Sequence, residues 1–297
     1  MLSFEKINAD NIMKTAEYIK YKISRTSDYT IGAVYMWRDF YDTSFAIHDN
    51  MIFYKVKFLN RTSFTYPVGS GSFSKAMEAI KEYCRINYLP LWFCTVPQEV
   101  IPILTEQYNG NVPSTPSRDW ADYLYRAEDL AEMAGRRFSG QRNHINKFLR
   151  NYPNYQYHVI TPDNLGKVIE FLKSYQQNFD KEDSLAKEEL ARTLEIMPLI
   201  HKFNLPGGFI EVDGKIVAMS VGEIIKDTLY VHIEKADRNY EGSYQMIVRE
   251  FARHNVTKDV KYINREEDVG DEGLRKSKLS YHPIELLDKY CVLVPYN

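Results

Sequence analysis

The chain has 297 residues, more than the ~100–200 residues of a typical domain, so we expect two domains. Apolar residues make up 44% of the chain and aromatic residues 14%, enough for two packed cores, which excludes a disordered or low-complexity protein. Lys and Arg number 38 against 40 Asp and Glu, and the net charge of −2 gives no overall attraction to nucleic acids or membranes. Any electrostatic partner must therefore be bound by a local patch.

Compartment and metal signals are weak throughout the sequence. No apolar run approaches the ~18 residues of a membrane span, and the N-terminus lacks the apolar core of a signal peptide. Cys84, Cys94 and Cys291 form no CxxC pair and stand among apolar neighbours, as reduced core residues do. Neither HExxH nor a paired Cys/His spacing occurs, so we expect no metal site. These features predict a soluble, cytoplasmic protein, and the lack of an exposed apolar stripe predicts a monomer.

The first half alternates helices and strands. Taken in chain order, the expected elements are a helix over 8–22, strands at 45–47, 51–56 and 62–68, a helix over 73–87, a strand at 91–95, a helix over 97–108 and a strand at 123–125. The glycines Gly69 and Gly71 form the loop that connects the third strand to its helix.

Between the halves lies the only basic stretch of the chain. No acid occurs between Met133 and Pro162, whereas five basic residues do: Arg136, Arg137, Arg142, Lys147 and Arg150. Ser139 can cap a helix whose apolar stripe is Ile145, Phe148 and Leu149, with basic side chains pointing away from it.

The second half repeats the order of the first. Thr161-Pro162-Asp163 predicts a helix start, and Pro198 is expected to end or kink a second helix. The remaining elements are strands at 208–212, 215–219 and 228–234, a loop at 237–242, a helix over 243–254, a strand at 260–264, a helix over 272–279 and a strand at 290–294. Asp213-Gly214 is a favoured two-residue hairpin turn.

This repetition predicts a diverged duplication. By position, the turn at 49–50 corresponds to that at 213–214, the strand at 91–95 to that at 260–264, and the strand at 123–125 to that at 290–292. We therefore expect an N-terminal domain over 1–126, a basic helical connector over 127–160 and a C-terminal domain over 161–297.

The order of elements resembles the GNAT acyltransferase fold, and particular segments resemble one family within it. These segments are 232–237, 262–270, 273–281 and the junction that holds Gly135, Arg142, Asn143 and Phe148, with 264–281 the most specific. The family comprises soluble bacterial proteins similar to the C-terminal domain of phosphatidylglycerol lysyltransferase, and the resemblance covers essentially the whole chain.

The resemblance implies an α/β (α+β) fold of two tandem GNAT-like domains, each a mixed, mostly antiparallel sheet flanked by helices. This arrangement is shared with the Fem-type aminoacyl transferases, which move an aminoacyl group from charged tRNA to a lipid head group or a cell-wall amine. The implied function is aminoacyl transfer to an amine or hydroxyl of a small molecule or lipid head group, with the active site in the C-terminal domain. A catalytically inactive ligand-binding module is the alternative of a different class.

A second enzymatic alternative is coenzyme-A-dependent N-acyl transfer, because GNAT enzymes bind the pyrophosphate of coenzyme A on a Gln/Arg-x-x-Gly-x-Gly/Ala loop. Arg238, Gly242 and Tyr244 are the corresponding candidates here. The loop has an extra residue, and both Glu241 and Tyr244 disfavour close approach by an anion. The alternative interpretation is that these residues form a tight strand-to-helix turn without a ligand.

Candidate catalytic residues come from the same half. His232 and Glu234 lie two apart, on one face of a predicted strand, where many GNAT enzymes place catalytic or substrate groups. Glu234 is the candidate proton acceptor, unless it forms an ion pair with Lys278 or Arg275, and Tyr281 is the candidate proton donor. His232 is a candidate substrate-binding residue or a buried, hydrogen-bonded core histidine.

A charged loop follows the predicted strand at 260–264, and loops beyond the carboxyl end of a strand border ligand crevices in open sheets. We expect it to bind substrate, although a solvated loop whose charges pair with each other fits the same composition. The candidate substrate-binding residues in and after it are Asn264, Arg265, Glu266, Asp268, Arg275 and Lys278.

The connector is the candidate tRNA site. Arg142, Lys147 and Arg150 could contact the phosphate backbone, and nearby tyrosines could stack on unpaired bases. A solvated helix that braces the two domains is the alternative.

Overall fold

The computed structural model describes residues 1–295 except 109, 111 and 176–183. The chain divides into two compact units. Unit 1 contains residues 1–122, 267–272 and the chain from 286 onward, and unit 2 contains residues 123–266 and 273–285. The expected boundaries therefore need correction: the connector at 127–160 belongs to unit 2, and the C-terminal strand belongs to unit 1.

Unit 1 is built on a mixed sheet in the order β1-β2-β3-β4-β6-β15-β7, with the short strand β5 paired to β3. All neighbouring pairs are antiparallel except β4 and β6. Its strands are β1 (Glu5–Lys6), β2 (Ser44–His48), β3 (Met51–Phe58), β4 (Arg61–Phe64), β5 (Val68–Gly69), β6 (Leu91–Pro97), β7 (Ser114–Pro116) and β15 (Lys289–Val294).

The helices of unit 1 follow from local signals. In α3 (Phe73–Ile86), the Ser72 side chain accepts a hydrogen bond from the Lys75 amide and so caps the N-terminus. Ala76, Met77, Ile80 and Cys84 are buried at helical spacing. The others are α1 (Ala16–Ile19), α2 (Ile31–Trp37) and α4 (Ile101–Gln107), with 3₁₀ turns at Ile12–Thr15, Gln98–Val100 and Arg118–Trp120. The single helix expected over 8–22 is thus limited to the 3₁₀ turn and the short α1.

Unit 2 repeats this plan. Its sheet has the order β14-β8-β13-β12-β11-β10-β9, and β12 and β13 form its parallel pair. Its strands are β8 (Asp122–Arg126), β9 (Gln156–Val159), β10 (Gly207–Val212), β11 (Lys215–Ile225), β12 (Thr228–Ala236), β13 (Tyr262–Asn264) and β14 (Glu285–Leu287). Asp213 and Gly214 both have positive φ, as the predicted hairpin turn requires.

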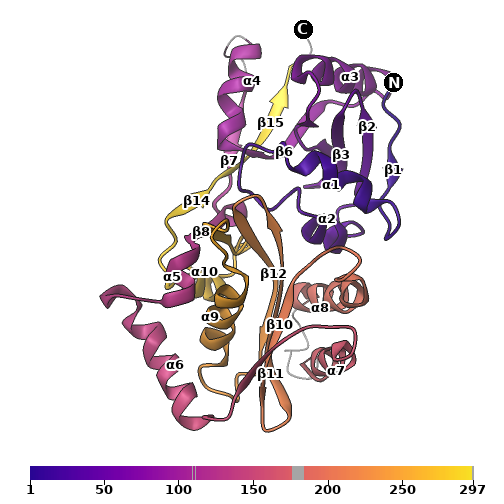
Figure 1. The fold of residues 1–297 in the computed structure, drawn as a ribbon. Helices are drawn as coiled ribbons and strands as arrows, with labels where there is room; N and C mark the ends of the chain where they lie inside the picture. Colours follow the sequence, from indigo (N-terminus) through magenta and orange to yellow (C-terminus); the bar gives the residue numbers. More distant parts are fainter. Residues whose placement is uncertain (109, 111, 176–183, 296–297) are drawn as a thin grey trace. The chain divides into compact units, whose positions relative to one another are not determined.

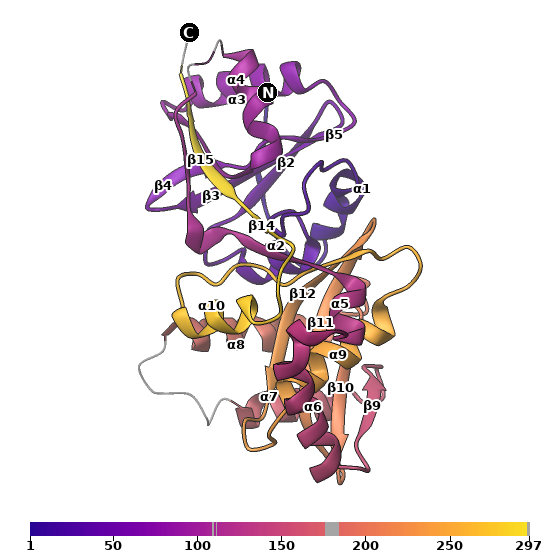
Figure 2. The ribbon, with the colours of Figure 1, turned by 90° about the vertical axis from the view of Figure 1, so that its left-hand side faces the viewer.

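Helices cover the two faces of this sheet. Helix α9 (Ser243–Asn255) lies on one face of β10–β12, and α7 (Leu165–Tyr175) and α8 (Ser184–Ile196) lie on the other (Figure 1). Helices α5 (Ala127–Glu132) and α6 (Ser139–Asn151) pack against α9 (Figure 2). The last helix is α10 (Glu272–Leu279), and short 3₁₀ turns lie at Arg136–Phe138 and Met197–Leu199.

The bounds of three helices in unit 2 can be compared with the capping and proline signals of the sequence. Helix α8 ends at Ile196 and continues as a 3₁₀ turn at Pro198, as predicted. Ser139 is the first residue of α6 and does not cap it, because the cap position is Phe138. Helix α7 begins at Leu165, later than expected, because Asn164 accepts the Thr161 amide in a preceding turn.

The two sheets exchange strands. Strand β7 is an edge of the unit 1 sheet, and the next strand, β8, pairs with β13 in unit 2. In the same way β14 is an edge of the unit 2 sheet, and β15 pairs with β6 in unit 1. The predicted correspondence of 123–125 with 290–292 is therefore confirmed, since β8 and β15 occupy equivalent places. Each strand, however, completes the sheet of the other half.

Candidate functional site

The parallel strands β12 and β13 separate at the point where the candidate residues begin. Their pairing is limited to Thr228–Tyr230 against Tyr262–Asn264, while β12 continues to Ala236. Beyond Tyr230 the side of β12 that faced β13 loses that partner. In parallel sheets, the groups just beyond the carboxyl ends of such strands border a ligand crevice. Glu234, in the continuing part of β12, and Arg265, directly after β13, both follow the point where this pairing ends.

A β-bulge at His232 directs the side chains along β12. Val221 pairs with Ile233 and Gly222 with Val231, so His232 is an extra residue without an opposite partner in β11. Glu234 consequently lines the same cavity as Leu229 and Val231, although regular alternation would place it on the other face. His232 instead contacts Glu223 of β11, which pairs with Tyr230. The expectation that His232 and Glu234 share a face is therefore wrong, because the bulge changes the alternation between them.

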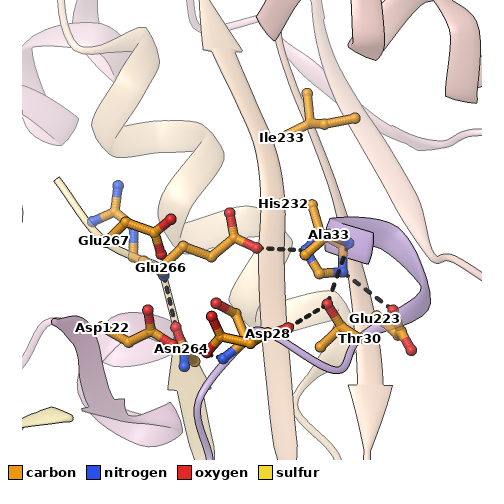
Figure 3. A network of polar contacts seen from close by, with 12 residues as sticks. Asp28, Thr30, Ala33, Asp122, Glu223, His232, Ile233, Asn264, Glu266 and Glu267 are labelled. Atoms are coloured by element: carbon orange, nitrogen blue, oxygen red, sulfur yellow. Dashed lines mark hydrogen bonds and ion pairs between the residues drawn. The ribbon is translucent and has the colours of Figure 1, made fainter. Parts of the chain in front are cut away.

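His232 lies between two carboxylates (Figure 3). Its Nδ1 is 2.7 Å from Glu266 Oε1, and its Nε2 is 3.3 Å from Glu223 Oε2. The His232 side chain is only 2% exposed, so burial alone would lower the pKa of its imidazole, but the hydrogen bonds to Glu223 and Glu266 raise that pKa to about 9. The two carboxylates therefore favour the charged imidazolium form of His232 at neutral pH. His232 is thus a buried, hydrogen-bonded histidine, which is one of the two alternatives predicted from the sequence.

A second ion pair links β12 to the end of β13. Arg265 Nη2 donates to Glu234 Oε1 at 2.6 Å, and the two side chains are 8% and 15% exposed. The Arg265 guanidinium also lies 4.6 Å from the centroid of the Tyr281 ring. The partner of Glu234 is thus Arg265, which corrects the expected Lys278 or Arg275. Burial raises the pKa of the Tyr281 phenol above 10, so this side chain keeps its proton at neutral pH.

A small cavity lies next to this ion pair. Its walls come from β12, β13, α5 and α9, and Arg265 and Glu234 supply its polar part. The cavity measures ≈ 10 Å³ for the centre of a water molecule, which is room for about one water-sized group. Arg265 Nη1 is a buried donor without a hydrogen-bond partner among the described residues. The apolar lining consists of Leu130, Leu229, Val231, Val248, Phe251, Ala252 and Ile263.

Other predicted substrate residues hold the backbone. Asn264 Oδ1 accepts the Glu266 amide at 2.7 Å and fixes the turn after β13, where Glu266 has a positive φ. Lys278 Nζ donates to the Arg265 carbonyl at 2.6 Å and to the Glu266 carbonyl at 3.3 Å. Asn264 and Lys278 therefore fix the backbone that carries the side chains of Arg265 and Glu266.

The predicted charged loop is divided between the two units. Asp268 belongs to unit 1, where its carboxylate lies 3.1 Å from Arg118 Nη1 and accepts the Gly270 amide at 3.0 Å. Arg275, in α10 of unit 2, is half-buried and makes contacts of its own. Neither joins the Glu234–Arg265 pair in the contacts described above.

Helix α6 covers the loop that precedes α9. A Cβ on Gly242 would lie 2.4 Å from the His144 carbonyl oxygen, so α6 packs directly on this glycine. Glu241 is ion-paired with Lys147 at 2.5 Å, and the Tyr240 ring lies 5.2 Å from that of Tyr152. The backbone next to Gly242 that would cradle a pyrophosphate is therefore occupied by protein.

The remaining candidate residues for coenzyme A do not form a cradle. Arg238 is exposed, and the Tyr244 hydroxyl is hydrogen-bonded to that of Tyr175 at 2.9 Å. Arg238, Gly242 and Tyr244 thus fit a strand-to-helix turn better than a coenzyme A site.

The basic residues of the connector are partly committed to protein contacts. Arg142 Nη1 donates to the carbonyls of Met133 and Gly135, and Lys147 pairs with Glu241. Arg137 is paired with Asp129 at 2.6 Å. Arg150 is exposed on α6. The connector thus keeps less positive charge for a nucleic acid than its sequence indicated.

Two features of the structure have no counterpart in the sequence prediction. Glu223 was missed because the strand was expected to end at Met219, whereas β11 continues to Ile225. In unit 1, Lys289 is buried among Asp28, Asp122 and Glu267, with its Nζ 3.2, 2.7 and 3.2 Å from their carboxylates. These partners are far apart in the sequence, so no local signal could have identified them.

Two kinds of feature are absent from the described part of the chain. Within the described part of the chain, no group of three His, Cys, Asp or Glu side chains could hold a metal ion. None of the helices there is long and apolar enough to cross a bilayer.

Comparisons with known proteins place this geometry in a family. A conserved protein of unknown function from Bacteroides thetaiotaomicron VPI-5482 is 32% identical with a TM-score of 0.92, covering 99% of this chain and 100% of that one. An uncharacterized protein of Mycoplasmoides gallisepticum is 26% identical over 174 residues, 58% of this chain and 56% of the relative, so the match spans about half of that curated relative.

Two more distant structures show the fold alone. L-PGS from Bacillus licheniformis is 13% identical with a TM-score of 0.64, covering 95% of this chain and 91% of that one. FemX is 8% identical with a TM-score of 0.66, covering 98% and 97%. The expected fold of two mixed sheets flanked by helices is confirmed. The family model described as phosphatidylglycerol lysyltransferase, C-terminal, matches residues 21–293, and the chain belongs to this family.

Proposed function

We propose that this protein is an aminoacyltransferase that moves an aminoacyl group from the ester of a charged tRNA to an amine or hydroxyl acceptor. The observation that carries the proposal is the cluster of Glu234, Arg265 and Tyr281 next to the point where the pairing of β12 and β13 ends. Membership of the phosphatidylglycerol lysyltransferase C-terminal family supports acyl chemistry of this class. The acceptor is a small molecule or a lipid head group.

The cluster supplies the groups that acyl transfer requires. The nitrogen or oxygen of the acceptor attacks the ester carbonyl carbon, and Glu234 Oε2 takes the acceptor's proton. The bond between the carbonyl carbon and the ribose oxygen then breaks, and the Tyr281 hydroxyl protonates that leaving oxygen. Arg265 Nη1 donates to the carbonyl oxygen as negative charge develops on it.

The covered loop favours this donor over coenzyme A. A coenzyme A pyrophosphate needs free backbone amides at the start of the helix. Here α6 packs on Gly242, and the neighbouring Glu241 would repel the anion even though Lys147 pairs with it. An aminoacyl ester carries no pyrophosphate next to the acyl group, so it places no such demand on this loop.

The test follows the label in a transfer reaction. Bulk tRNA charged with radiolabelled amino acids is mixed with the protein and a bacterial extract of lipids and small amines. We expect label to leave the acid-precipitable RNA and to appear in an acceptor in proportion to the amount of protein. Release of label at the rate of spontaneous ester hydrolysis, with no labelled acceptor, would refute the proposal.

Matched variants connect the activity to the cluster. Glu234→Gln and Tyr281→Phe keep the shape of each side chain and remove its proton chemistry. Glu128→Gln and Tyr88→Phe change exposed residues in the same way and serve as controls. A thermal-shift titration with acetyl-CoA completes the set: we expect no saturable shift, and a saturable one would favour the coenzyme A alternative.

A further inference from the structure

We propose that unit 1 carries a docking surface for an anionic lipid bilayer, at the turn that connects β3 to β4. The inference does not depend on the proposed transfer reaction. Three properties carry it: a continuous chain of aromatic rings, a strained apolar residue at the turn, and cations on both faces of the hairpin. We call this surface the hairpin patch, and its residues are Trp37, Phe40, Tyr41, Lys57, Phe58, Leu59, Arg61 and Trp120.

Aromatic rings run without interruption across the hairpin patch. The Phe40 ring centroid lies 5.7 Å from that of Trp37 and 4.9 Å from that of Tyr41. The Phe58 ring centroid lies 6.2 Å from that of Tyr41 and 5.1 Å from that of Trp120. Phe40 is 52% exposed, and the two tryptophans are half-buried. Contiguous apolar surface of this kind marks an interaction site, whereas apolar residues exposed singly do not.

Neither packing nor turn geometry explains the leucine at position 59. Leu59 is 61% exposed, and both Leu59 and Asn60 have a positive φ, 49° and 59°. Such turns favour Asn, Asp or Gly, because bulkier side chains are strained there. The turns at 49–50 and 213–214 also have two positive φ angles, and they hold Asp-Asn and Asp-Gly. A strained and exposed leucine at this turn therefore indicates contact with an apolar partner.

Cations flank Leu59 on both faces of the hairpin. In the register of β3 and β4, Arg61 is opposite Phe58 and shares its face, whereas Lys57 points to the other face. Both cations are exposed, and within the described residues neither forms an ion pair with a carboxylate. No Asp or Glu occurs in residues 51–64. The hairpin therefore presents positive charge around an apolar tip.

The carboxylates next to the aromatic residues do not cancel this charge. Asp39 is ion-paired with Arg38 at 3.2 Å, and Asp42 is ion-paired with Lys6. Asp119, beside Trp120, makes contacts of its own. The excess charge of the hairpin patch is therefore positive, although the chain as a whole has a net charge of −2.

An anionic bilayer surface fits this combination. Trp and Tyr are enriched at the boundary between the hydrocarbon of a bilayer and water, where the ring is buried and its polar atom stays hydrated. Binding to such a surface strengthens with the apolar area that enters the bilayer and with the attraction of Lys and Arg to anionic lipids. Leu59 and Phe40 supply the apolar area, and Lys57 and Arg61 supply the attraction.

The test measures binding to vesicles of defined composition. The protein is sedimented with vesicles of phosphatidylcholine alone and with vesicles of phosphatidylcholine and phosphatidylglycerol in equal parts. We expect binding to the mixed vesicles, and we expect salt to weaken it because salt screens the attraction between charges.

Tryptophan emission provides a second measurement of the same binding. Trp92 lies 4.5 Å from the Arg61 guanidinium, so all three tryptophans of the chain lie in or beside the hairpin patch. We expect their emission to shift to shorter wavelength when mixed vesicles are added. Phosphatidylcholine vesicles should give a much smaller shift.

Replacing Leu59 removes the apolar tip and keeps the turn. Asn is favoured at a positive φ, so Leu59→Asn should melt no lower than the unchanged protein. We expect Leu59→Asn to bind mixed vesicles about tenfold more weakly, because burying a leucine side chain changes an equilibrium constant by at least about that factor. Ile103→Asn, at a 42% exposed site in α4, is the control and should leave binding unchanged.

Replacing Lys57 tests the charge separately. Lys57→Gln should weaken binding to mixed vesicles about fivefold, the contribution of one Lys or Arg near an anionic surface. Its binding to phosphatidylcholine vesicles should not change. Lys75→Gln, at an exposed site in α3 outside the hairpin patch, is the matched control.

The outcomes either support the docking surface or overturn it. No sedimentation with mixed vesicles would overturn it, and so would equal binding of Leu59→Asn and the unchanged protein. Sedimentation velocity without lipid covers the other occupant: a dimer that Leu59→Asn dissociates, in a protein that binds no vesicles, would assign the patch to a second copy of the chain. These measurements contain no tRNA and no acyl acceptor, so their failure would leave the proposed function untouched.

Discussion

Each unit contains a parallel strand pair, and the residues that follow this pair differ between the units. In unit 1, β4 and β6 pair at Phe64 and Phe93, and the residues of β6 that follow this pairing include the buried Cys94 and Val96. In unit 2, the exit of β13 is Arg265-Glu266, and both side chains pair with charged groups of β12. The same topology is thus closed by an apolar core in one unit and by ion pairs in the other.

This difference indicates where the chemistry lies. Burying ion pairs is often no better for stability than burying apolar groups of the same size, so stability alone does not explain the charges of unit 2. Unit 1 shows that the same strand pair can be followed by buried apolar residues, without ion pairs. We therefore place the proposed acyl transfer in unit 2.

Unit 1 has its own buried charges, but at another place. Lys289 begins β15, and its partners lie in a loop (Asp28), at the start of β8 (Asp122) and after β13 (Glu267). Burial alone would lower the pKa of Lys289, but the three carboxylates raise it well above its usual value. The lysine therefore ties the segments that enter and leave unit 1, which is a structural task.

Removing that lysine should give the largest effect on stability. Lys289→Met leaves three carboxylates without their cation, and breaking a buried ion pair in this way costs about 3–5 kcal/mol of unfolding free energy. Urea denaturation followed by tryptophan fluorescence measures the change. Lys261→Met, at an exposed site, is the control. A loss below about 1 kcal/mol would mean that the cluster does not hold unit 1 together.

Glu234 and Tyr281 should give the largest effect on turnover. Glu234→Gln and Tyr281→Phe are expected to reduce the rate of transfer ~10²-fold or more, because each removes one proton-transfer group. The equivalent aromatic change in unit 1, Tyr66→Phe, should leave the rate unchanged. Initial rates of label transfer provide the measurement. Similar losses in Tyr66→Phe and Tyr281→Phe would remove the functional contrast between the units.

His232 should make stability depend on pH. Its folded pKa of about 9 exceeds the unperturbed value of 6.5 because Glu223 and Glu266 hold the imidazolium. The stabilisation is therefore fully present below about pH 6.5 and is lost as the pH rises through about 9. Since one pKa unit corresponds to about 1.4 kcal/mol, this stabilisation is on the order of 3 kcal/mol.

Replacing the histidine isolates that contribution. His232→Gln should flatten the part of the stability curve between pH 6.5 and 9, whereas the exposed His144→Gln should not. Urea midpoints measured across this range decide the matter. A curve with the same slope in both variants would show that His232 is neutral in the folded protein.

Several features that depend on short-range signals were predicted correctly from the sequence. Asp213-Gly214 identified its hairpin, the bounds of α10 were predicted correctly, and the repeated order of elements indicated the duplication. The bulge at His232 was not predicted because it depends on the register between β11 and β12. The alternation of residues within one strand does not reveal that register.

Pairings between residues far apart in the chain could not be predicted from the sequence for a related reason. The exchange of β8 and β15 depends on the sheet with which each strand pairs, and the residues of a single strand do not specify that sheet. Arg265 was selected as a substrate residue, but its pairing with Glu234 joins residues 31 apart and carries no local signature. The sequence thus identified residues of the candidate site but did not predict which of them contact each other.

The smallest expected effect is on the binding of charged tRNA by α6, the helix that covers the loop before α9. No equivalent of this helix was predicted in the first half of the chain. If charged tRNA also contacts α6, the exposed Arg150 is the residue to change, since Arg142 and Lys147 already bond to protein groups. Arg150→Glu should weaken retention of charged tRNA on a filter and lower the slope of log affinity against log salt by about 1. Glu241→Gln, which frees Lys147, should strengthen retention if α6 faces the tRNA. Unchanged retention in both variants would limit α6 to covering the loop, and the donor would then be held by unit 2 outside the connector.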